Sequence, residues 1–312
     1  MLSTRHWACS RFSTEFGDEL AGTASVVNGY LLIEHGGPWG RKVLQDAEFT
    51  DPDGAVVPLG GQLDQTLKPL GVTTLLVRRL GSGHGIPAPT TVMLVALDAR
   101  GGTGARRTVD AVSEIADWDL PALLDQLRSG EVPAGWQPME RQYLVCTHAR
   151  RDACCGELGR PVAAAFRDLA PEHTWEASHV GGHRLASNAL VLPEGFSYGR
   201  LEPGDAEPLI AAHSSGRLLV DSLRGRAALP RPVQAAEVAL RAETATDRVD
   251  ALELLETDAG ESQTRTLWAV GEQRWRVVID VLPGEGPPRP ASCAAVDGPP
   301  PVRHVVSEIA RV

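Results

Sequence analysis

The stretch QYLVCTHARRDACCGELGRPVAAAFRDLAPEHTWEAS, residues 142–178, predicts two strands joined by a helix. The strands are the short apolar runs QYLVC (142–146), which ends in a cysteine, and TWEAS (174–178), which ends directly before a histidine. Between them, RPVAAAFRDLA (160–170) predicts a helix with Pro161 in its first turn, where a missing N–H costs nothing. Each predicted strand therefore leads directly to a residue that can bind a metal.

The residues that follow add a hairpin and a second helix. NALVL (188–192) and FSYGRL (196–201) flank the turn PEG, and DAEPLIAAHSSG (205–216) predicts a helix with Asp205 as its N-cap. Strand, helix, strand, hairpin and helix, in that order, is the layout of a thioredoxin-like unit. We therefore predict an α/β protein whose middle domain, residues 138–232, is thioredoxin-like.

The first part of the chain predicts a β-rich N-terminal domain over residues 1–137. RGGTGARR (100–107) predicts a turn at a hairpin tip, and DLPALLDQLRSG (119–130) predicts a short helix with Asp119 as its N-cap. The connector EVPAGWQPME then places a domain boundary near residue 138. Apolar, β-branched runs predict three strands, at ASVVNGYLLI (24–33), VTTLLVRRL (72–80) and TTVMLVALD (90–98).

The last part of the chain, residues 233–312, predicts an α+β C-terminal region. VQAAEVALRAE (233–243) predicts a helix, and VDALELLET, TRTLWAV and WRVVIDVL predict strands. The stretch PGEGPPRPASCAAVDGPPP (283–301) is rich in Pro and Gly and predicts a loop. HVVSEIARV (304–312) can then return as an edge strand.

Composition excludes several classes of protein. The 312 residues are 43% hydrophobic and 22% charged, which is typical of a globular protein, and the net charge of −10 disfavours nucleic acid or an anionic membrane as a partner. No apolar run is long enough to span a bilayer, and the N-terminus lacks the apolar core of a secretory signal, so we expect a cytoplasmic protein. Five cysteines are few and odd in number, which in a reducing compartment favours metal binding or chemistry over disulfides.

Four potential metal ligands lie in the loops that follow the two central strands. Cys146 and Cys155 are separated by eight residues, and His179 and His183 by three. The histidine pair lies in HVGGHRLASN (179–188), where two adjacent glycines would each cost about 1 kcal/mol in a helix, so this stretch predicts a tight loop. Two thiolates and two imidazoles suit either zinc or a two-iron two-sulfur (2Fe-2S) cluster with both histidines on one iron.

These motifs resemble a known family. CTHARRDACC (146–155) and HVGGHRLASN (179–188) are similar to the corresponding stretches of the sucrase/ferredoxin-like family. Its thioredoxin-like ferredoxins hold a 2Fe-2S cluster, and histidines can replace the second cysteine pair. Further similar stretches are GTA (22–24), GPWG (37–40), GRPVA (159–163) and AAHSSGRL (211–218).

The resemblance implies a ligand set. Carried over residue by residue, it implies that Cys146, Cys155, His179 and His183 hold a 2Fe-2S cluster, with Cys154 as the alternative thiolate. The "sucrase" part of the family name has no counterpart here, because no pair of carboxylates is placed for glycoside hydrolysis.

Other side chains near the ligands have two interpretations. They can donate hydrogen bonds to the sulfurs or hold the outer imidazole nitrogens, or they can be solvated loop residues. Cys9 and Cys293 are expected to be ordinary small apolar residues, although the fold can bring either thiol to the site. GGPWG predicts a turn anchored by Trp39. The flanking side chains are His148, Arg150, Arg151, Asp152, Arg184 and Asn188.

The function that follows from the cluster is one-electron transfer. Neutral imidazoles make the site less negative than four thiolates would, so we expect a potential above that of an all-cysteine cluster. An imidazole ligand keeps one ring nitrogen that can titrate, so we also expect proton-coupled reduction. A potential that does not change from mildly acidic to alkaline pH would contradict the coupling. The chain has no flavin or nicotinamide fingerprint, which predicts a separate reductase as redox partner.

Two alternatives remain open at this point. The same four residues can hold zinc in a structural interaction module. Cys154 and Cys155 can instead act as a thiol oxidoreductase, which we rank last because adjacent cysteines lack the C-x-x-C spacing and are not expected at a helix N-terminus.

Overall fold

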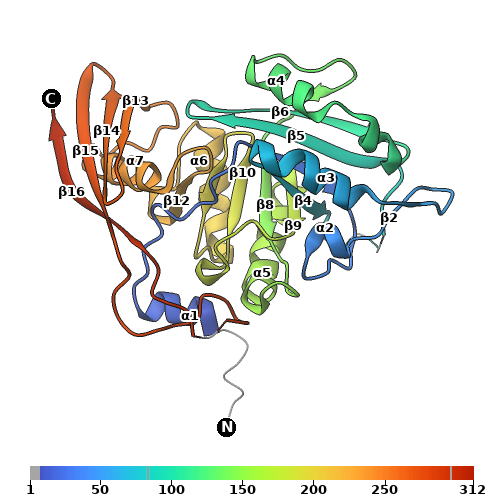
Figure 1. Ribbon diagram of the computed structural model, residues 1–312, viewed down its shortest axis with the longest axis horizontal. Helices are drawn as coiled ribbons and strands as arrows, with labels where there is room; N and C mark the ends of the chain where they lie inside the picture. The colour runs from blue at the N-terminus through green and yellow to red at the C-terminus, as the bar shows by residue number, and fades with distance from the viewer. Residues whose placement is uncertain (1–7, 82, 84, 296) are drawn as a thin grey trace, which may run out of the picture.

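The computed structural model describes residues 8–312 except 82, 84 and 296 (Figure 1). The fold is α/β, as predicted, with one large curled sheet and a separate antiparallel sheet. A two-stranded ribbon, β2 (Phe49–Thr50) and β3 (Val56–Val57), completes the β-structure of these residues. Among the described residues, no helix has the length and apolar character needed to cross a membrane.

Ten strands form the large sheet, and they come from both sides of residue 138. The central pairing is β4 with β9, which are antiparallel, with Val77 opposite Ala177. The order across the sheet is β12 (Leu223–Arg226), β11 (Phe196–Tyr198), β10 (Ala189–Leu192), β8 (Gln142–Cys146), β9 (Thr174–Ala177), β4 (Val72–Arg78), β1 (Gly29–Glu34), β5 (Thr90–Asp98), β6 (Gly101–Val109) and β7 (Gln137–Pro138).

Strands β8 and β9 are parallel and joined by helix α5 (Ala153–Leu169), as the sequence predicts. Cys146 is opposite Ala177 in their register, so both strands end at the same edge of the sheet. The predicted start of the helix at residue 160 is wrong, because α5 begins seven residues earlier and contains Pro161 in its interior. Packing decides the start: Gly159 lies so close to the carbonyl oxygen of Cys146 that a Cβ would clash with it.

The predicted hairpin tip is present but shorter than residues 100–107, because Arg100 lies in the turn and residues 101–107 are strand. β6 pairs antiparallel with β5 along its whole length, from Asp98 opposite Gly101 to Thr90 opposite Val109. The connection is therefore only two residues long. Gly102 allows the backbone at Pro193 to pack closely against β6, since a Cβ on Gly102 would clash with the carbonyl oxygen of Pro193.

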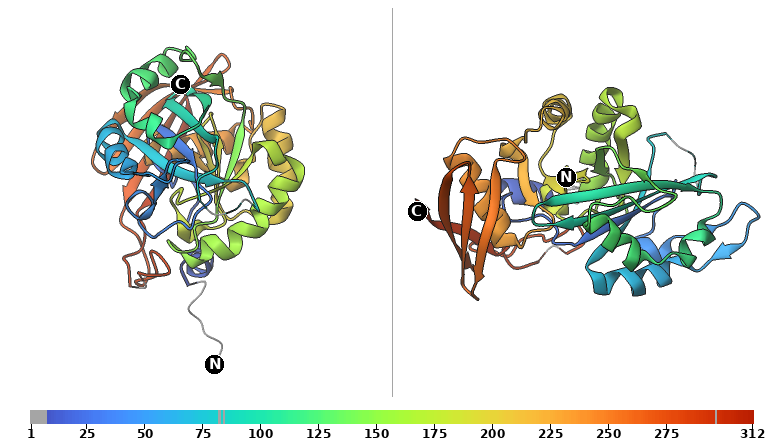
Figure 2. Two further views of the ribbon diagram at one scale, coloured as in Figure 1. Left: turned by 90° about the vertical axis from the view of Figure 1, so that its right-hand side faces the viewer. Right: turned by 90° about the horizontal axis from the view of Figure 1, so that it is seen from above.

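Two groups of helices pack on the large sheet. One apolar cluster joins β1, β4 and β5 to α3 (Leu59–Leu67) and α4 (Leu120–Arg128), and another joins β8, β10 and β11 to α5 and α6 (Ala206–Ser214). Figure 2 (right) shows the two groups on opposite sides of the molecule. A third cluster includes Leu32, Val95, Cys146 and Leu190, so the candidate ligand Cys146 lies on a core shared by both halves of the sheet.

The C-terminal region is α+β, as predicted. Its sheet consists of β13 (Leu252–Ala259), β14 (Gln263–Val270), β15 (Gln273–Leu282) and β16 (Arg303–Arg311), all antiparallel, and β16 is an edge strand. Helix α7 (Arg231–Glu243) packs against it. Figure 1 shows the long connection between β15 and β16 returning to helix α1 (Ala8–Glu15). The short helix α2 (Val43–Asp46) precedes the β2–β3 ribbon.

Candidate metal centre

The two predicted cysteine ligands meet beside the end of β8. Cys146 is the last residue of that strand, and Cys155 lies in the first turn of α5. Both side chains are buried, and their thiols hydrogen-bond to each other. The short connection between them is held at the sheet, because the Thr147 N–H donates to the carbonyl oxygen of Ala177 over 3.1 Å.

Electrostatics favours one thiolate in this pair. The Cys155 thiol donates to Cys146 and lowers the pKa of Cys146 well below its ordinary value, in spite of burial. His179 and the backbone N–H of His148 act in the same direction. The pKa of Cys155 is raised by the same contact. The pair therefore shares a proton, and Cys146 carries the thiolate, which is the form that binds metals.

Residues 179–182 are a loop, as the glycines predict, but the predicted loop 179–188 also contains a short 3-10 turn, His183–Leu185. Gly181 and Gly182 adopt φ values of +90° and +73°, which side chains rarely tolerate. Buried Arg224 lies directly against this loop and donates to the carbonyl oxygen of Gly181 over 3.2 Å and to Asn188 Oδ1 over 2.9 Å. Asn188 in turn donates to the carbonyl oxygen of Gly182 over 3.0 Å. Asn188 therefore shapes the loop.

The two histidine rings lie side by side, with centroids 5.3 Å apart and planes at 45°. Among the described residues, Nδ1 of His179 and both ring nitrogens of His183 are buried and have no hydrogen-bond partner. Burial lowers the pKa of His183, so its ring is neutral at neutral pH, which is the form that coordinates a metal. Buried polar atoms without a partner are rare, and binding to a metal would satisfy one nitrogen of each ring.

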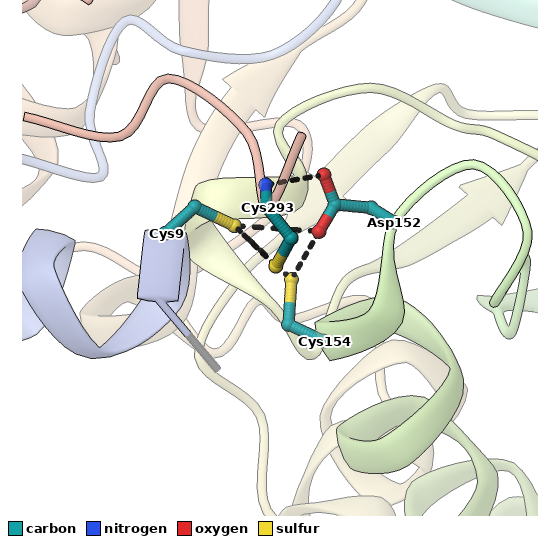
Figure 3. Close-up of side chains that lie close together, drawn as sticks. All are labelled: Cys9, Asp152, Cys154 and Cys293. Carbon is teal, nitrogen blue, oxygen red and sulfur yellow. Dashed lines mark hydrogen bonds between the residues drawn. The ribbon is translucent and has the colours of Figure 1, made fainter. Parts of the chain in front are cut away.

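A second group of thiols lies next to this site (Figure 3). Cys9 of α1, Cys154 of α5 and Cys293 of the β15–β16 connection surround the carboxylate of Asp152. The Cys9 Sγ is 3.3 Å from the Cys154 Sγ and 3.4 Å from the Cys293 Sγ. The two groups adjoin, since His183 Nε2 is 3.6 Å from Asp152 Oδ2 and the Cys154 thiol donates to the carbonyl oxygen of His183 over 3.1 Å.

This placement corrects one expectation from the sequence. Cys154 and Cys155 do lie at a helix N-terminus, because α5 begins at Ala153. The error follows from the late start predicted for that helix. Asp152 is not a solvated loop residue, since it is only 3% exposed and contacts both groups. Its position directly before a cysteine pair at the start of a helix is the sequence signal that could have identified it.

The other flanking residues lie at different places. His148 is buried, bonds to the carbonyl oxygen of Gly40 over 2.9 Å and packs edge-to-face on Trp39 at 6.0 Å. The Trp39 side chain is buried, as predicted. Arg184 pairs with Asp18 at 2.8 Å. Arg150 and Arg151 are exposed.

A cavity of about 460 Å³ borders the histidine loop. Its lining includes His183, Gly181 and Gly182 from the loop, together with Arg231 and His304 from the C-terminal region. The His183 side of the site therefore adjoins this cavity, while Cys146 and Cys155 are buried.

Replacing Gly182 by alanine should destabilise the loop. The left-handed backbone alone costs about 1–2 kcal/mol with a side chain, and a Cβ would meet the guanidinium of Arg224. We expect a lower free energy of unfolding in urea and weaker metal retention. Gly204→Ala is the matched control, because Gly204 has open space and no positive φ, and should stay within about 0.5 kcal/mol of the unchanged protein. Equal effects of the two substitutions would contradict this account of the loop.

Comparison with known proteins identifies relatives. The model of the sucrase/ferredoxin-like family matches residues 20–225, more than half of the chain. Altered inheritance of mitochondria protein 32 of Saccharomyces cerevisiae is 32% identical over 96 residues, which cover 26% of this chain and 31% of that protein. The protein of the same name from Saccharomyces kudriavzevii is 33% identical over 96 residues, with the same coverage. The match therefore spans about a third of these relatives. No solved structure matches significantly.

Proposed function

Because the chain belongs to the sucrase/ferredoxin-like family, we propose that it is a one-electron carrier whose 2Fe-2S cluster is held by Cys146, Cys155, His179 and His183. One observation carries the proposal. Two buried thiols lie at the end of β8 and the start of α5, and two half-buried imidazoles lie in and directly after the loop that follows β9. Three of the ring nitrogens are buried and have no hydrogen-bond partner among the described residues.

The donor set fits such a cluster. When bound, a 2Fe-2S cluster takes up and releases one electron. The chain's own part is to hold two thiolates and two neutral imidazoles in a buried place and to balance their charge. Arg224 supplies positive charge: burial lowers its pKa to about 10, so it remains protonated at neutral pH, and it interacts favourably with Cys146.

The finer description of the middle domain is part of the same proposal. A thioredoxin-like ferredoxin unit over residues 138–232 is supported by the sheet order β9-β8-β10-β11, with α5 connecting the parallel pair and β10–β11 as the hairpin.

Proton coupling is supported by the environment of His183. It borders the cavity of about 460 Å³, and Asp152, His179 and Arg151 are the charged or titratable groups that act on its ring. Proton exchange between this ring and solvent, through the cavity, is part of the proposal. A separate reductase as partner and a cytoplasmic location are further parts of the proposal. The location is supported by five cysteines that are all free, as expected in a reducing compartment.

The thiol oxidoreductase alternative is less well supported. Cys154 is fully buried, and its contacts with Cys155 together with burial raise its pKa above the ordinary value. A buried protonated thiol is a poor nucleophile, in spite of its position at a helix N-terminus. Zinc held by the same four ligands is also less well supported. Two thiolates and two imidazoles are a common zinc set, but the donors that the described residues bring within 4.8 Å of one another are those of Cys9, Asp152, Cys154 and Cys293.

The deciding experiment measures iron and acid-labile sulfide per chain on anaerobically purified protein. We expect two of each, with a reddish-brown spectrum that dithionite bleaches. A colourless protein without sulfide, with zinc bound at these four residues, would refute the electron-carrier proposal and favour the structural module.

A further inference from the structure

We propose that Cys9, Asp152, Cys154 and Cys293 form a second metal site that binds one zinc-class divalent cation and joins the two ends of the chain to helix α5. The site is separate from the proposed cluster and does not depend on it, because it uses none of the four cluster ligands.

The geometry of the four donors is compact enough for a single ion. One donor atom from each residue lies within 4.8 Å of all the others. Zinc–thiolate bonds of about 2.3 Å in a tetrahedron place sulfurs about 3.8 Å apart. The two Sγ–Sγ distances of Cys9, 3.3 and 3.4 Å, need to open by only a few tenths of an ångström.

The carboxylate is oriented as a ligand would be. Asp152 Oδ1 faces the sulfurs, at 3.0 Å from the Cys154 Sγ and 3.4 Å from the Cys9 Sγ. Its other oxygen, Oδ2, accepts the backbone N–H of Cys293 over 3.1 Å. Metal-binding carboxylates are characteristically held by such an outer hydrogen bond. Figure 3 shows this division of the two oxygens.

Neither apolar packing nor a disulfide accounts for all four side chains. Apolar packing does not explain why three thiols surround a buried carboxylate. Burying a carboxylate without a cation costs free energy. A disulfide would join only two of the three sulfurs and would leave a thiol and the carboxylate behind. Cys9 is nearly equidistant from the other two sulfurs, so the geometry selects neither pair. One cation satisfies all four donors.

Such a cation would cross-link segments that are far apart in the sequence. Cys9 is 145 positions from Cys154 and 284 from Cys293, and the cation would connect the three segments that carry them. Asp18, which follows α1, makes ion pairs with Arg184 of the turn after β9 at 2.8 Å and with Arg289 of the β15–β16 connection at 2.6 Å. The cation would hold α1 and the β15–β16 connection beside His183, and so would enclose the candidate cluster site.

The test is the metal content of the full chain, produced with zinc present and then freed of loosely bound ions. We expect one zinc per chain in addition to iron. Cys293→Ser and Cys9→Ser should each lose zinc and keep iron. A Cys146→Ser/His179→Ala double variant should lose iron and keep zinc, so failure of the cluster proposal and failure of this one are distinguishable.

Two controls separate metal binding from docking of the chain ends. Ser10→Ala changes a buried neighbour of Cys9 on α1, and Asp18→Asn weakens the two ion pairs of Asp18. Both should retain zinc. If Cys9→Ser does not fold, alkylation of the unchanged protein gives the answer: zinc should slow modification of Cys9, Cys154 and Cys293 at least tenfold. The absence of zinc after equilibration with Zn²⁺, equal alkylation rates, or a disulfide between two of these cysteines would overturn the proposal.

Discussion

Replacing Cys146 by serine should remove iron and sulfide from the purified chain almost completely. Of the two proposed cysteine ligands, Cys146 is the one whose pKa is lowered, it ends a central strand, and a serine hydroxyl does not supply a thiolate. The measurement is iron and acid-labile sulfide per chain, together with the visible spectrum.

Cys154→Ser is the matched control for this result. Cys154 is equally buried and directly adjacent to Cys155, but its thiol faces Asp152 and Cys9, and we expect this variant to keep its iron. Loss of iron from Cys154→Ser with retention in Cys146→Ser would show that the ligand assignment is wrong. Loss from both would place Cys154 in the cluster site.

Replacing Glu237 by glutamine should destabilise the fold by about 3–5 kcal/mol, because it leaves two buried guanidinium groups without their counter-charge. Glu237 of α7 is fully buried and pairs with Arg226 of β12 at 2.7 Å and with Arg241 at 2.9 Å. Burial opposes its ionisation, but the two arginines outweigh burial and lower the pKa of Glu237. Its contribution is therefore present above the ordinary pKa of a carboxyl and is lost as the pH falls through the folded value. Urea unfolding at neutral pH measures the effect.

Glu308→Gln is the control for the removal of a carboxylate. Glu308 of β16 pairs with Arg276 of β15 at 2.6 Å, but both side chains are more than 40% exposed, and such pairs contribute about 0–1 kcal/mol. Equal losses of stability from the two substitutions would refute the argument that burial of the Glu237 pair matters.

Much of the fold could be predicted because the deciding signals are local. The apolar runs that end at Cys146 and just before His179 are strands, and alternation and turn residues identify the β10–β11 hairpin and the edge strand β16. Double glycine in HVGGH excludes an α-helix through backbone preference alone, and in the structure residues 179–182 are a loop that leads into the 3-10 turn His183–Leu185. These features depend on neighbours within a few residues.

Other features escape prediction from the sequence because distant contacts decide them. The glycines in residues 101–104 look like a turn, yet they lie in β6, where the backbone of Pro193 leaves no room for a side chain at Gly102. Helix α5 begins at Ala153 instead of near residue 160, because its first two turns pack against the end of β8 through Gly159.

By itself, the sequence determined that strands lead to Cys146 and to His179, that a helix connects them and that residues 179–182 are a loop, because spacing and backbone preference are properties of the chain. Only the tertiary structure decided that Cys154 and Cys155 meet different partners, because α5 packs with Cys155 toward Cys146 of β8 and Cys154 toward Cys9 of α1. It also decided that Cys9 and Cys293 reach Asp152. That meeting results from the packing of both chain ends on α5, and no spacing within one segment encodes it.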